Sequence, residues 1–187
     1  MTRIVAGTAG GRALRTPTGS RTRPTSEKVR AALFNALEAR DAVRGARVLD
    51  LFAGSGALGL EAASRGAAAV TFVENDRRAA ALIRANALDL ALPSVSVLTA
   101  SVAQVLAAEG HPAYDLVVLD PPYDLPEPAL AGILAQLVAG GWLTPQADVV
   151  VERATRSGEP TWPQGLNPAR AKRYGESTLW FAVGSRP

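Results

Sequence analysis

The stretch Val48–Ala62, V-L-D-L-F-A-G-S-G-A-L-G-L-E-A, decides the fold of this chain. An apolar run leads into Gly54, Gly56 and Gly59, which have the spacing G-x-G-x-x-G, and a helix-forming segment follows. A strand that ends in such a loop brings backbone N–H groups and the first turn of a helix close to a bound anion. Glu74 follows twenty positions after Gly54, where an acid can accept hydrogen bonds from the hydroxyls of a ribose. The stretch predicts a nucleotide-binding α/β unit, although the glycines alone also fit a tight turn with close helix packing and no ligand.

The segments that follow continue the alternation of strand and helix. Expected strands at 47–52, 69–74, 95–98, 114–120 and 148–152 alternate with expected helices at 57–64, 77–92, 102–108 and 130–138, and strands at 171–174 and 178–183 follow. Alternation of this kind predicts a mainly parallel sheet with helices on both faces. The last two strands are too close in sequence for a crossover helix, so we expect a hairpin that makes the last strand antiparallel.

The first 25 residues have a different pattern. Ile4–Ala6 and Ala13–Leu14 are separated by glycines, as in a small hairpin, and residues 16–24 are rich in Pro, Gly, Ser and Arg, as in a loop. A helix is expected to open at Thr25-Ser26-Glu27, because a hydroxyl cap followed by an acid is typical of a helix N-terminus. We therefore divide the chain into a basic N-terminal extension, residues 1–25, and a main α/β domain, residues 26–187.

Composition narrows the classes of protein and of site. The chain has 187 residues, of which 48% are hydrophobic, and this is enough for one substantial core. It has no cysteine and a single histidine, so disulfides, thiolate metal sites and His-rich clusters are excluded and no metal is expected. No apolar run is long enough to span a bilayer and none resembles a signal peptide, so we expect a soluble cytoplasmic protein that binds no membrane.

Charge is distributed unevenly along the chain. Residues 1–30 carry seven Lys and Arg against one Glu, and residues 153–187 carry six against two acids. Residues 31–152 carry seven basic against fourteen acidic side chains. An acidic body with basic ends is typical of a protein that holds a polyanion with those ends. The same arginines could instead only solubilise the ends, and charge alone favours neither interpretation.

Asp50, four residues before Gly54, separates two classes of cofactor. A carboxylate at the mouth of the loop would repel the pyrophosphate of a dinucleotide. The same carboxylate suits S-adenosylmethionine, which carries an ammonium and a sulfonium and whose own carboxylate can use the N–H groups of the loop. We therefore expect S-adenosylmethionine, and keep an NAD-dependent oxidoreductase as an alternative that only the glycine spacing supports.

The sequence Asp120-Pro121-Pro122-Tyr123 follows an expected strand, at the end where open α/β sheets bind their ligands. Two consecutive prolines fix the backbone and remove two N–H donors, so the carbonyls of Asp120 and Pro121 are expected to point outward. A carboxylate and a rigid carbonyl can accept both hydrogens of a planar exocyclic amine, and Tyr123 offers a face on which a base can stack. The four residues predict N-methylation of a nucleobase, with Asp120 taking a proton late in the transfer.

Several motifs resemble those of known protein families. The glycine stretch, V-E-N-D at 73–76 and D-P-P-Y at 120–123 resemble class I amino-methyltransferases that use S-adenosylmethionine. Three further stretches narrow the resemblance to one family within this class. They are R-I-V-A-G-T-A-G-G-R-A-L at 3–14, R-P-T-S-E-K-V-R-A-A-L-F-N at 23–35 and R-Y-G-E-S-T-L-W-F at 173–181. Together they resemble the bacterial 16S ribosomal RNA guanine-N2 methyltransferases, the RsmD-like family, over almost the whole chain.

The resemblance implies a Rossmann-like class I methyltransferase fold with a seven-stranded, mostly parallel sheet, an antiparallel last strand and a small N-terminal extension. It implies methylation of the exocyclic N2 of a guanine in 16S ribosomal RNA, free or within a small ribosomal subunit or its assembly intermediate. Since nothing in the sequence suggests an obligate dimer, we expect a monomer. The expected cofactor residues are Asp50, Phe52, Ala53, Gly54, Ser55, Gly56, Glu74, Asn75, Ser101 and Val102. Many methyltransferases carry an acid for the adenine where this chain has Ala100-Ser101-Val102, so Ser101 or a backbone N–H is expected to serve there.

The basic residues then become candidate RNA contacts, which would make binding strongly dependent on salt. The expected phosphate contacts are Arg12, Arg15, Arg21, Arg23, Arg170, Lys172 and Arg173. Two alternatives remain open. Adenine presents a planar amine as guanine does, so an adenine-N6 methyltransferase acting on DNA or RNA also fits, although no long target-recognition domain is present. A non-catalytic RNA-binding factor that keeps the fold fits the charge distribution.

Overall fold

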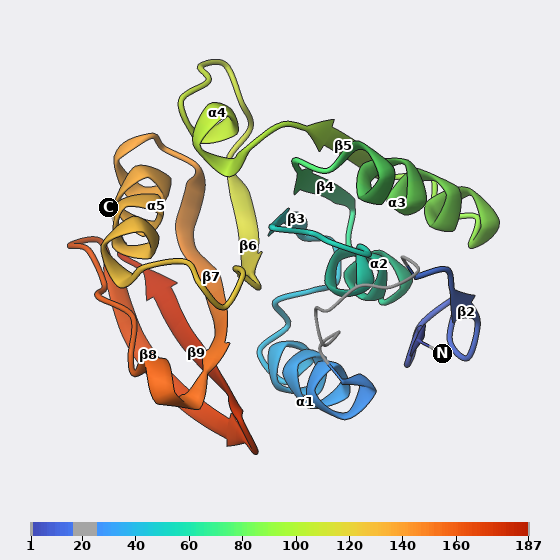
Figure 1. Ribbon diagram of the computed structural model, residues 1–187, viewed down its shortest axis with the longest axis horizontal. Coiled ribbons are helices and arrows are strands. Elements are labelled where there is room, and N and C mark those ends of the chain that lie inside the picture. Colours follow the sequence, from blue (N-terminus) through green and yellow to red (C-terminus); the bar gives the residue numbers. More distant parts are fainter. Residues whose placement is uncertain (1, 17–25, 187) are drawn as a thin grey trace.

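The computed structural model describes residues 2–16 and 26–186, and it is built around a central sheet with helices on both faces (Figure 1). Within these residues the sheet has seven strands in the order β5-β4-β3-β6-β7-β9-β8. The strands are β3 (Arg47–Leu51), β4 (Ala69–Glu74), β5 (Val95–Thr99), β6 (Tyr114–Leu119), β7 (Leu143–Ala154), β8 (Leu166–Tyr174) and β9 (Ser177–Gly184). Strands β3 to β7 pair in parallel, so the fold class predicted from the alternation of strand and helix is confirmed.

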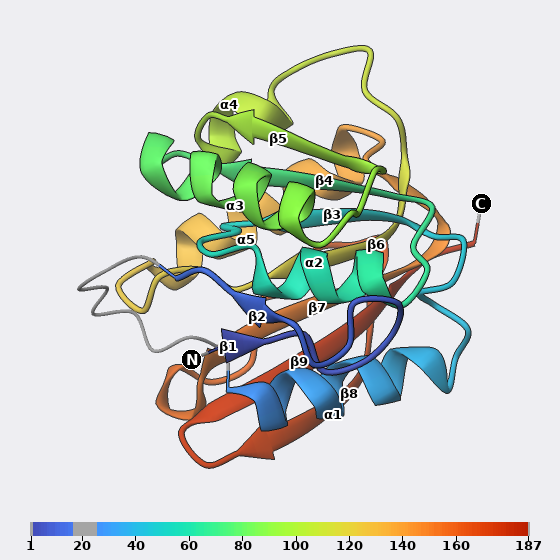
Figure 2. The same ribbon diagram turned by 90° about the vertical axis from the view of Figure 1, so that its right-hand side faces the viewer.

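The helices divide between the two faces of the sheet. They are α1 (Glu27–Glu38), α2 (Ala57–Ser64), α3 (Arg77–Asp89), α4 (Val102–Leu106) and α5 (Glu127–Ala139), and a short 3-10 turn, η1, covers Thr155–Ser157. Helices α1, α2 and α3 cover one face with one buried cluster, and α4 and α5 cover the other face with a second (Figures 1 and 2). Burial on both faces explains why the central strands are mostly continuous apolar runs. Among the described residues, no helix has both the length and the apolar character that crossing a bilayer requires.

The last two strands form the expected hairpin, and β9 is antiparallel to β7 as well as to β8. The structure adds that β9 lies between its two partners, so β8 is the edge strand. The sequences explain this order, because β9 is mostly buried whereas eight of the nine residues of β8 are exposed or partly exposed. Charged side chains and a proline on an edge strand hinder pairing with another chain.

Several element boundaries differ from those expected. Helix α3 ends at Asp89 rather than at Leu92, because Ala91 takes a φ of 54°, which no α-helix continues through. Helix α5 begins at Glu127 rather than at Leu130, since proline fits the first turn of a helix, where its missing N–H is not needed. Strand β7 extends beyond the expected 148–152 at both ends, and β8 begins before Ala171.

The N-terminal hairpin lies against α2 (Figure 2). Its strands are β1 (Thr2–Arg3) and β2 (Ala13–Leu14), which pair antiparallel. The expected strand at Ile4–Ala6 is therefore wrong in its position. The N–H groups of Val5 and Ala6 donate to the two carboxylate oxygens of Glu61, at 2.8 Å and 3.0 Å, and not to a partner strand.

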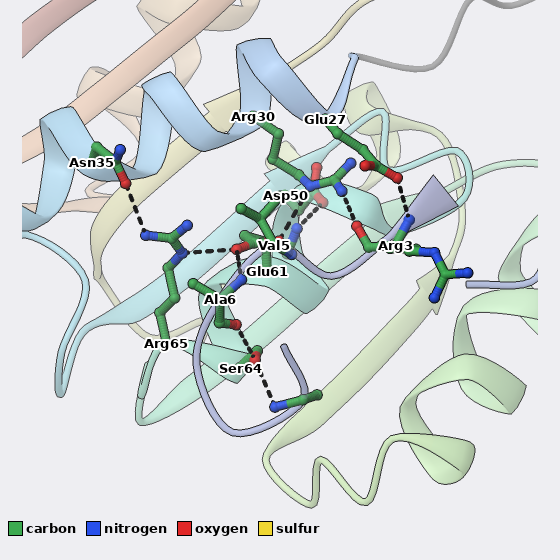
Figure 3. A network of polar contacts seen from close by, with 12 residues as sticks. Arg3, Val5, Ala6, Glu27, Arg30, Asn35, Asp50, Glu61, Ser64 and Arg65 are labelled. Atoms are coloured by element: carbon green, nitrogen blue, oxygen red, sulfur yellow. Dashed lines mark hydrogen bonds and ion pairs between the residues drawn. The ribbon is translucent and has the colours of Figure 1, made fainter. Parts of the chain in front are cut away.

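A buried ionic network fixes this hairpin to α1 and α2 (Figure 3). Glu61 is fully buried, and it also accepts from Nε of Arg30 at 3.2 Å and from Nε of Arg65 at 2.8 Å. Arg30 donates in addition to the carbonyl oxygen of Arg3, and Arg65 donates to Glu38 at 2.8 Å. One carboxylate thus joins the hairpin, α1 and α2, and a buried ion pair of this kind loses most of its stabilisation when one partner is removed.

Candidate active site

The loops that follow β3, β4 and β6 gather at one edge of the sheet, at the left-hand side of Figure 2. The loop after β3 carries the glycine motif, and its backbone is unusual. Gly54 and Gly56 take φ values of 56° and 78°, and Phe52 takes 62°, which is costly for a residue with a side chain. Gly59 has a different function, since a Cβ there would lie 2.3 Å from the ring of Phe72 on β4. The glycines therefore shape the loop and let α2 lie directly on the sheet.

Asp50 does not lie at the mouth of this loop, which corrects the position expected from the sequence. It is 1% exposed, and its Oδ2 accepts a hydrogen bond of 2.8 Å from the N–H of Gly59. Its place one residue before the end of β3, under the first turns of α2, explains the burial. Burial raises the pKa of Asp50 from 3.8 to about 7; the Gly59 N–H lowers it and the nearby charge of Glu74 adds to the rise. Asp50 thus supports the loop from beneath.

Glu74, at the end of β4, links the loop after its own strand to the glycine loop. Its Oε2 accepts from the N–H of Gly54 at 2.7 Å, and its Oε1 accepts from the N–H of Asp76 at 2.7 Å. The side chain is mostly buried, with 9% of the residue exposed. These bonds hold the carboxylate in one orientation, and each oxygen keeps a second acceptor position for a ligand hydroxyl.

A pocket of about 400 Å³, here called the large pocket, lies between the glycine loop, the loop after β5 and α5. Half of the expected cofactor residues line it: Phe52, Glu74, Asn75, Ser101 and Val102. The structure adds Leu125 and four residues of α5, namely Ala129, Gly132, Ile133 and Gln136, which the sequence did not indicate. The walls are mostly apolar with one carboxylate, and the volume suits a ligand of nucleoside size.

The other expected cofactor residues lie beside the large pocket and not in its wall. Ala53, Gly54, Ser55 and Gly56 form the turn between β3 and α2, with the N–H of Gly56 bonded to the carbonyl of Ala53 at 2.7 Å. Ser101 lines the pocket, but its hydroxyl caps α4 by accepting from the N–H of Gln104 at 3.2 Å. The backbone N–H of Ser101 donates to the side chain of the same Gln104, so both of its expected contacts to an adenine compete with this cap.

Asp120, Pro121, Pro122 and Tyr123 line a second cavity, here called the small hollow, at the end of β6. It has a volume of only about 10 Å³ and is completed by Glu152, Arg153, Ala154 and Ser157. Tyr123 is 57% exposed beside this hollow. The sequence did not indicate Glu152 or Arg153, although Glu152 was the last residue of an expected strand and such ends meet at the binding edge of a parallel sheet.

Arg153 holds the segment between the two cavities. Its guanidinium forms an ion pair with Glu127, at the start of α5, and Nη2 donates to the carbonyl oxygen of Leu125 at 3.5 Å. Glu127 also accepts from the N–H of Thr161 at 2.6 Å. Burial lowers the pKa of Arg153 below its usual value, but the group remains charged at neutral pH. Because Leu125 lines the large pocket and Tyr123 the small hollow, this ion pair fixes the segment that both cavities share.

The basic residues expected to contact RNA have different environments. Arg12 donates to the carbonyl of Asp89 and Arg15 pairs with the carboxylate of Asp89 at 2.7 Å, so both are tied to the end of α3. Arg170 places its guanidinium 4.4 Å from the centre of the Phe181 ring and donates to the carbonyl of Ala36, which indicates a packing contact as well. Lys172 and Arg173 are exposed on the edge strand β8, and Arg21 and Arg23 lie outside the described residues.

A family model described as conserved hypothetical protein 95 matches residues 2–183. The chain is 37% identical over 174 residues to ribosomal RNA small subunit methyltransferase D of Escherichia coli K12, which covers 93% of this chain and 85% of that protein. The chain belongs to the RsmD methyltransferase family. Another relative, an rRNA methyltransferase of Bacillus subtilis named YlbH, is 33% identical over 92% of this chain and 94% of its own length.

Solved structures agree with membership of the RsmD family. The yhhF methyltransferase of Escherichia coli superposes with a TM-score of 0.88 at 34% identity, over 100% of this chain and 99% of that chain. Magnesium protoporphyrin IX methyltransferase of Synechocystis, solved with bound S-adenosylmethionine, superposes with a TM-score of 0.67 at 17% identity, over 84% of this chain and 79% of its own, which shows the shared fold. The prediction of a methyltransferase is confirmed, and the alternative of an NAD-dependent oxidoreductase is wrong.

Proposed function

We propose that this protein transfers the methyl group of S-adenosylmethionine to the exocyclic N2 of a guanine in small-subunit ribosomal RNA. The observation that carries the proposal is the arrangement of residues 120–127. One end of this segment presents the D-P-P-Y side chains to the small hollow, and the other end places Leu125 in the wall of the large pocket. A donor in one cavity and a base in the other would therefore meet across a single rigid loop.

The large pocket fits the nucleoside part of S-adenosylmethionine. Phe52, Val102 and Ile133 offer apolar surface to an adenine, and the Glu74 carboxylate, held by two backbone N–H groups, can accept from ribose hydroxyls. The N–H groups of Gly54, Gly56 and Gly59 already donate within the protein, so the methionine carboxylate would use the N–H groups at the other positions of this turn, residues 55, 57 and 58. When bound, S-adenosylmethionine supplies a methyl group on a cationic sulfur, and that sulfur keeps the electron pair of the broken C–S bond.

The small hollow fits the acceptor base. The lone pair of an exocyclic amine is delocalised into the ring, so the amine is a poor nucleophile until its hydrogens are held by acceptors. The Asp120 carboxylate and the Pro121 carbonyl provide two acceptors, and Tyr123 provides a stacking face. As the N–C bond forms, the nitrogen becomes acidic, and Asp120 is placed to take the proton that it releases. The loop holds these groups in place before the base arrives, which is where most of the rate gain of such a site comes from.

The acceptor RNA is proposed from the names of the relatives and from the charge of the chain. Relatives that are 37% identical are named methyltransferases of small-subunit ribosomal RNA. The basic end segments, with Lys172 and Arg173 exposed on β8 and Arg21 and Arg23 in the segment 16–24, supply the positive charge that phosphate contacts require. We further propose that the protein acts as a monomer in the cytoplasm, on 16S ribosomal RNA that is free or within an assembling small subunit.

Nucleoside mapping tests this function. Small-subunit RNA, both naked and within purified subunits, is prepared from cells that lack the protein and is incubated with the protein and S-adenosylmethionine. We expect one N2-methylguanosine per RNA, and the form of RNA that reacts identifies the substrate. N6-methyladenosine as the sole product would replace this function with the adenine-N6 alternative, and RNA binding without any methyl transfer would indicate a non-catalytic factor.

A further inference from the structure

Glu152 lies beside Asp120 at the binding edge of the sheet. Leu119 of β6 pairs with Val151 of β7 in parallel register, so the residues that follow them, Asp120 and Glu152, are neighbours across the two strands. Adjacent strands are about 4.8 Å apart, and residues in register point to the same face of a sheet. Both residues line the small hollow together with Tyr123, and Glu152 is largely buried there, with 8% exposed.

A carboxylate at this place distinguishes guanine from adenine. The amine that reacts in guanine, N2, is adjacent to the ring atom N1, which carries a hydrogen and donates it. The atom next to the amine of adenine is also N1, but there it carries a lone pair and repels a carboxylate. Groups that hydrogen-bond one base edge and leave the wrong edge unpaired give strong discrimination.

We propose that Glu152 determines the specificity of this site for guanine, by accepting the N1–H of the target base while Asp120 and Pro121 hold its N2 amine. This inference rests on the proposed function and names the contact that selects its base.

The positive charge of the neighbouring Arg153 has a different function from the proposed contact between Glu152 and the base. The side chain of Arg153, next in sequence, is directed to Glu127 and to the carbonyl of Leu125. Arg153 also lines the small hollow, but its guanidinium is held by these two partners. Arg153 therefore positions the loop, whereas Glu152 is the acid that lines the hollow in which the base is expected.

A base analogue tests the contact directly. The guanine identified by nucleoside mapping is replaced by 2-aminopurine in a synthetic segment ligated into the small-subunit RNA. This analogue keeps the 2-amino group, but its N1 carries a lone pair in place of the hydrogen. With the wild-type protein we expect kcat/KM for 2-aminopurine to be roughly 10- to 100-fold below that for guanine, as one good contact to a base edge gives.

The variant Glu152→Gln separates recognition from structure. Its amide can donate to the N1 of 2-aminopurine or accept from the N1–H of guanine, so the guanine to 2-aminopurine ratio should fall to near one. Glu152→Asp keeps the carboxylate and should keep most of the discrimination. Asp124→Asn removes one exposed charge from the same loop outside the hollow and should leave the ratio unchanged.

The binding of S-adenosylmethionine to Glu152→Gln, measured by calorimetry, should match that of the wild type, because Glu152 does not line the large pocket. A variant that discriminates as strongly as the wild type, or a wild type that methylates both bases equally, would overturn the inference while the proposed function stands. A wild type that forms no N2-methylguanosine would overturn both, and this outcome is visible without any variant.

Discussion

The large pocket and the small hollow, which lie at the same edge of the sheet, are built in different ways. The large pocket has a volume of about 400 Å³, and its key carboxylate, Glu74, is already held by two backbone N–H groups. The small hollow has only about 10 Å³, and its aromatic residue, Tyr123, is 57% exposed. The proposed donor side is thus an enclosed pocket, whereas the proposed acceptor side is a more open surface.

The difference has a structural cause. The large pocket is enclosed by several elements that are fixed in the core, including α5 and the loops after β3, β4 and β5. The small hollow depends on one loop, residues 120–126, and on the end of β7, which the ion pair between Arg153 and Glu127 connects. Substitutions on the two sides should therefore affect different quantities, namely donor affinity on one side and methyl transfer on the other.

The largest effect is expected at the buried network that holds α2, and with it the glycine loop of the donor side. Glu61→Ala removes the shared partner of Arg30 and Arg65 and leaves two arginines without it in a buried place. We expect the free energy of unfolding to fall by about 3–5 kcal/mol, which urea unfolding followed by circular dichroism measures. Glu109→Ala, an exposed glutamate on the same chain, is the control and should change it by less than about 0.5 kcal/mol. A loss below about 1 kcal/mol for Glu61→Ala would show that the hairpin does not depend on this carboxylate.

The next effect concerns only the acceptor side. Asp120→Ala removes one of the two proposed acceptors for the amine, so methyl transfer should fall roughly 10²- to 10³-fold, as removal of one preorganised polar group from an active site typically does. The affinity for S-adenosylmethionine should stay within about twofold, because Asp120 does not line the large pocket. Transfer of radiolabelled methyl and calorimetry measure the two quantities.

Asp124→Ala, in the same loop but exposed, is the matched control for Asp120→Ala and should keep nearly full activity. A loss of donor binding equal to the loss of activity in Asp120→Ala would contradict the separation of the two cavities.

On the donor side, Glu74→Ala removes the acceptor of the Gly54 and Asp76 N–H groups together with the proposed ribose contact. Hydrogen bonds to a charged group contribute about 1.5–3 kcal/mol, so S-adenosylmethionine should bind roughly 10- to 100-fold more weakly. The methyl transfer rate should largely recover at saturating donor. Glu74→Gln keeps one acceptor oxygen, so its affinity for S-adenosylmethionine should lie between those of the wild type and Glu74→Ala. An unchanged dissociation constant in Glu74→Ala would show that Glu74 does not contact the donor.

The smallest expected effect is a change in how the free energy of unfolding depends on pH. It tests Asp50, which lies beneath the glycine loop. The folded state raises the pKa of Asp50 from 3.8 to about 7, so between these values the folded protein binds more protons than the unfolded chain. The contribution of Asp50 to stability therefore falls as pH rises from about 4 to about 7, by at most about 1.4 kcal/mol per pH unit. Asp50→Asn cannot titrate and can still accept from the N–H of Gly59.

Urea unfolding at several pH values compares Asp50→Asn with the wild type. The variant should have a stability close to that of the wild type near pH 4 and should gain relative to it toward pH 7. Parallel pH profiles for the two proteins would show that Asp50 is ionised throughout this range in the folded state.

The comparison of the two cavities also shows which residues the sequence could indicate. Phe52, Glu74 and Ser101 each follow or end an expected strand, and the ends of parallel strands meet at one edge, so their common pocket was predictable. The contribution of the α5 residues to this pocket was not predictable, because nothing in the sequence of an apolar helix indicates which residues face a pocket and which face the core. Glu152 was visible as a strand end, but its proximity to Asp120 depends on the register of β6 and β7.

The environment of Asp50 was also not predictable from the sequence alone. Its spacing from the glycines placed it correctly near the loop, but its side chain lies beneath the loop, since Gly59 allows α2 to lie directly over it. The edge position of β8 likewise depends on β9 inserting beside β7, which no local pattern states.

The sequence by itself determined the alternation of strands and helices, the glycine turn, the D-P-P-Y motif and the family, because spacing, backbone freedom and proline geometry act over a few residues. Only the tertiary structure decided that Glu61 joins three segments, that Asp50 is buried with a raised pKa, and that Glu152 stands beside Asp120. Burial, register and exclusion of water arise from residues far apart in the chain. They therefore exist only once those residues have packed together.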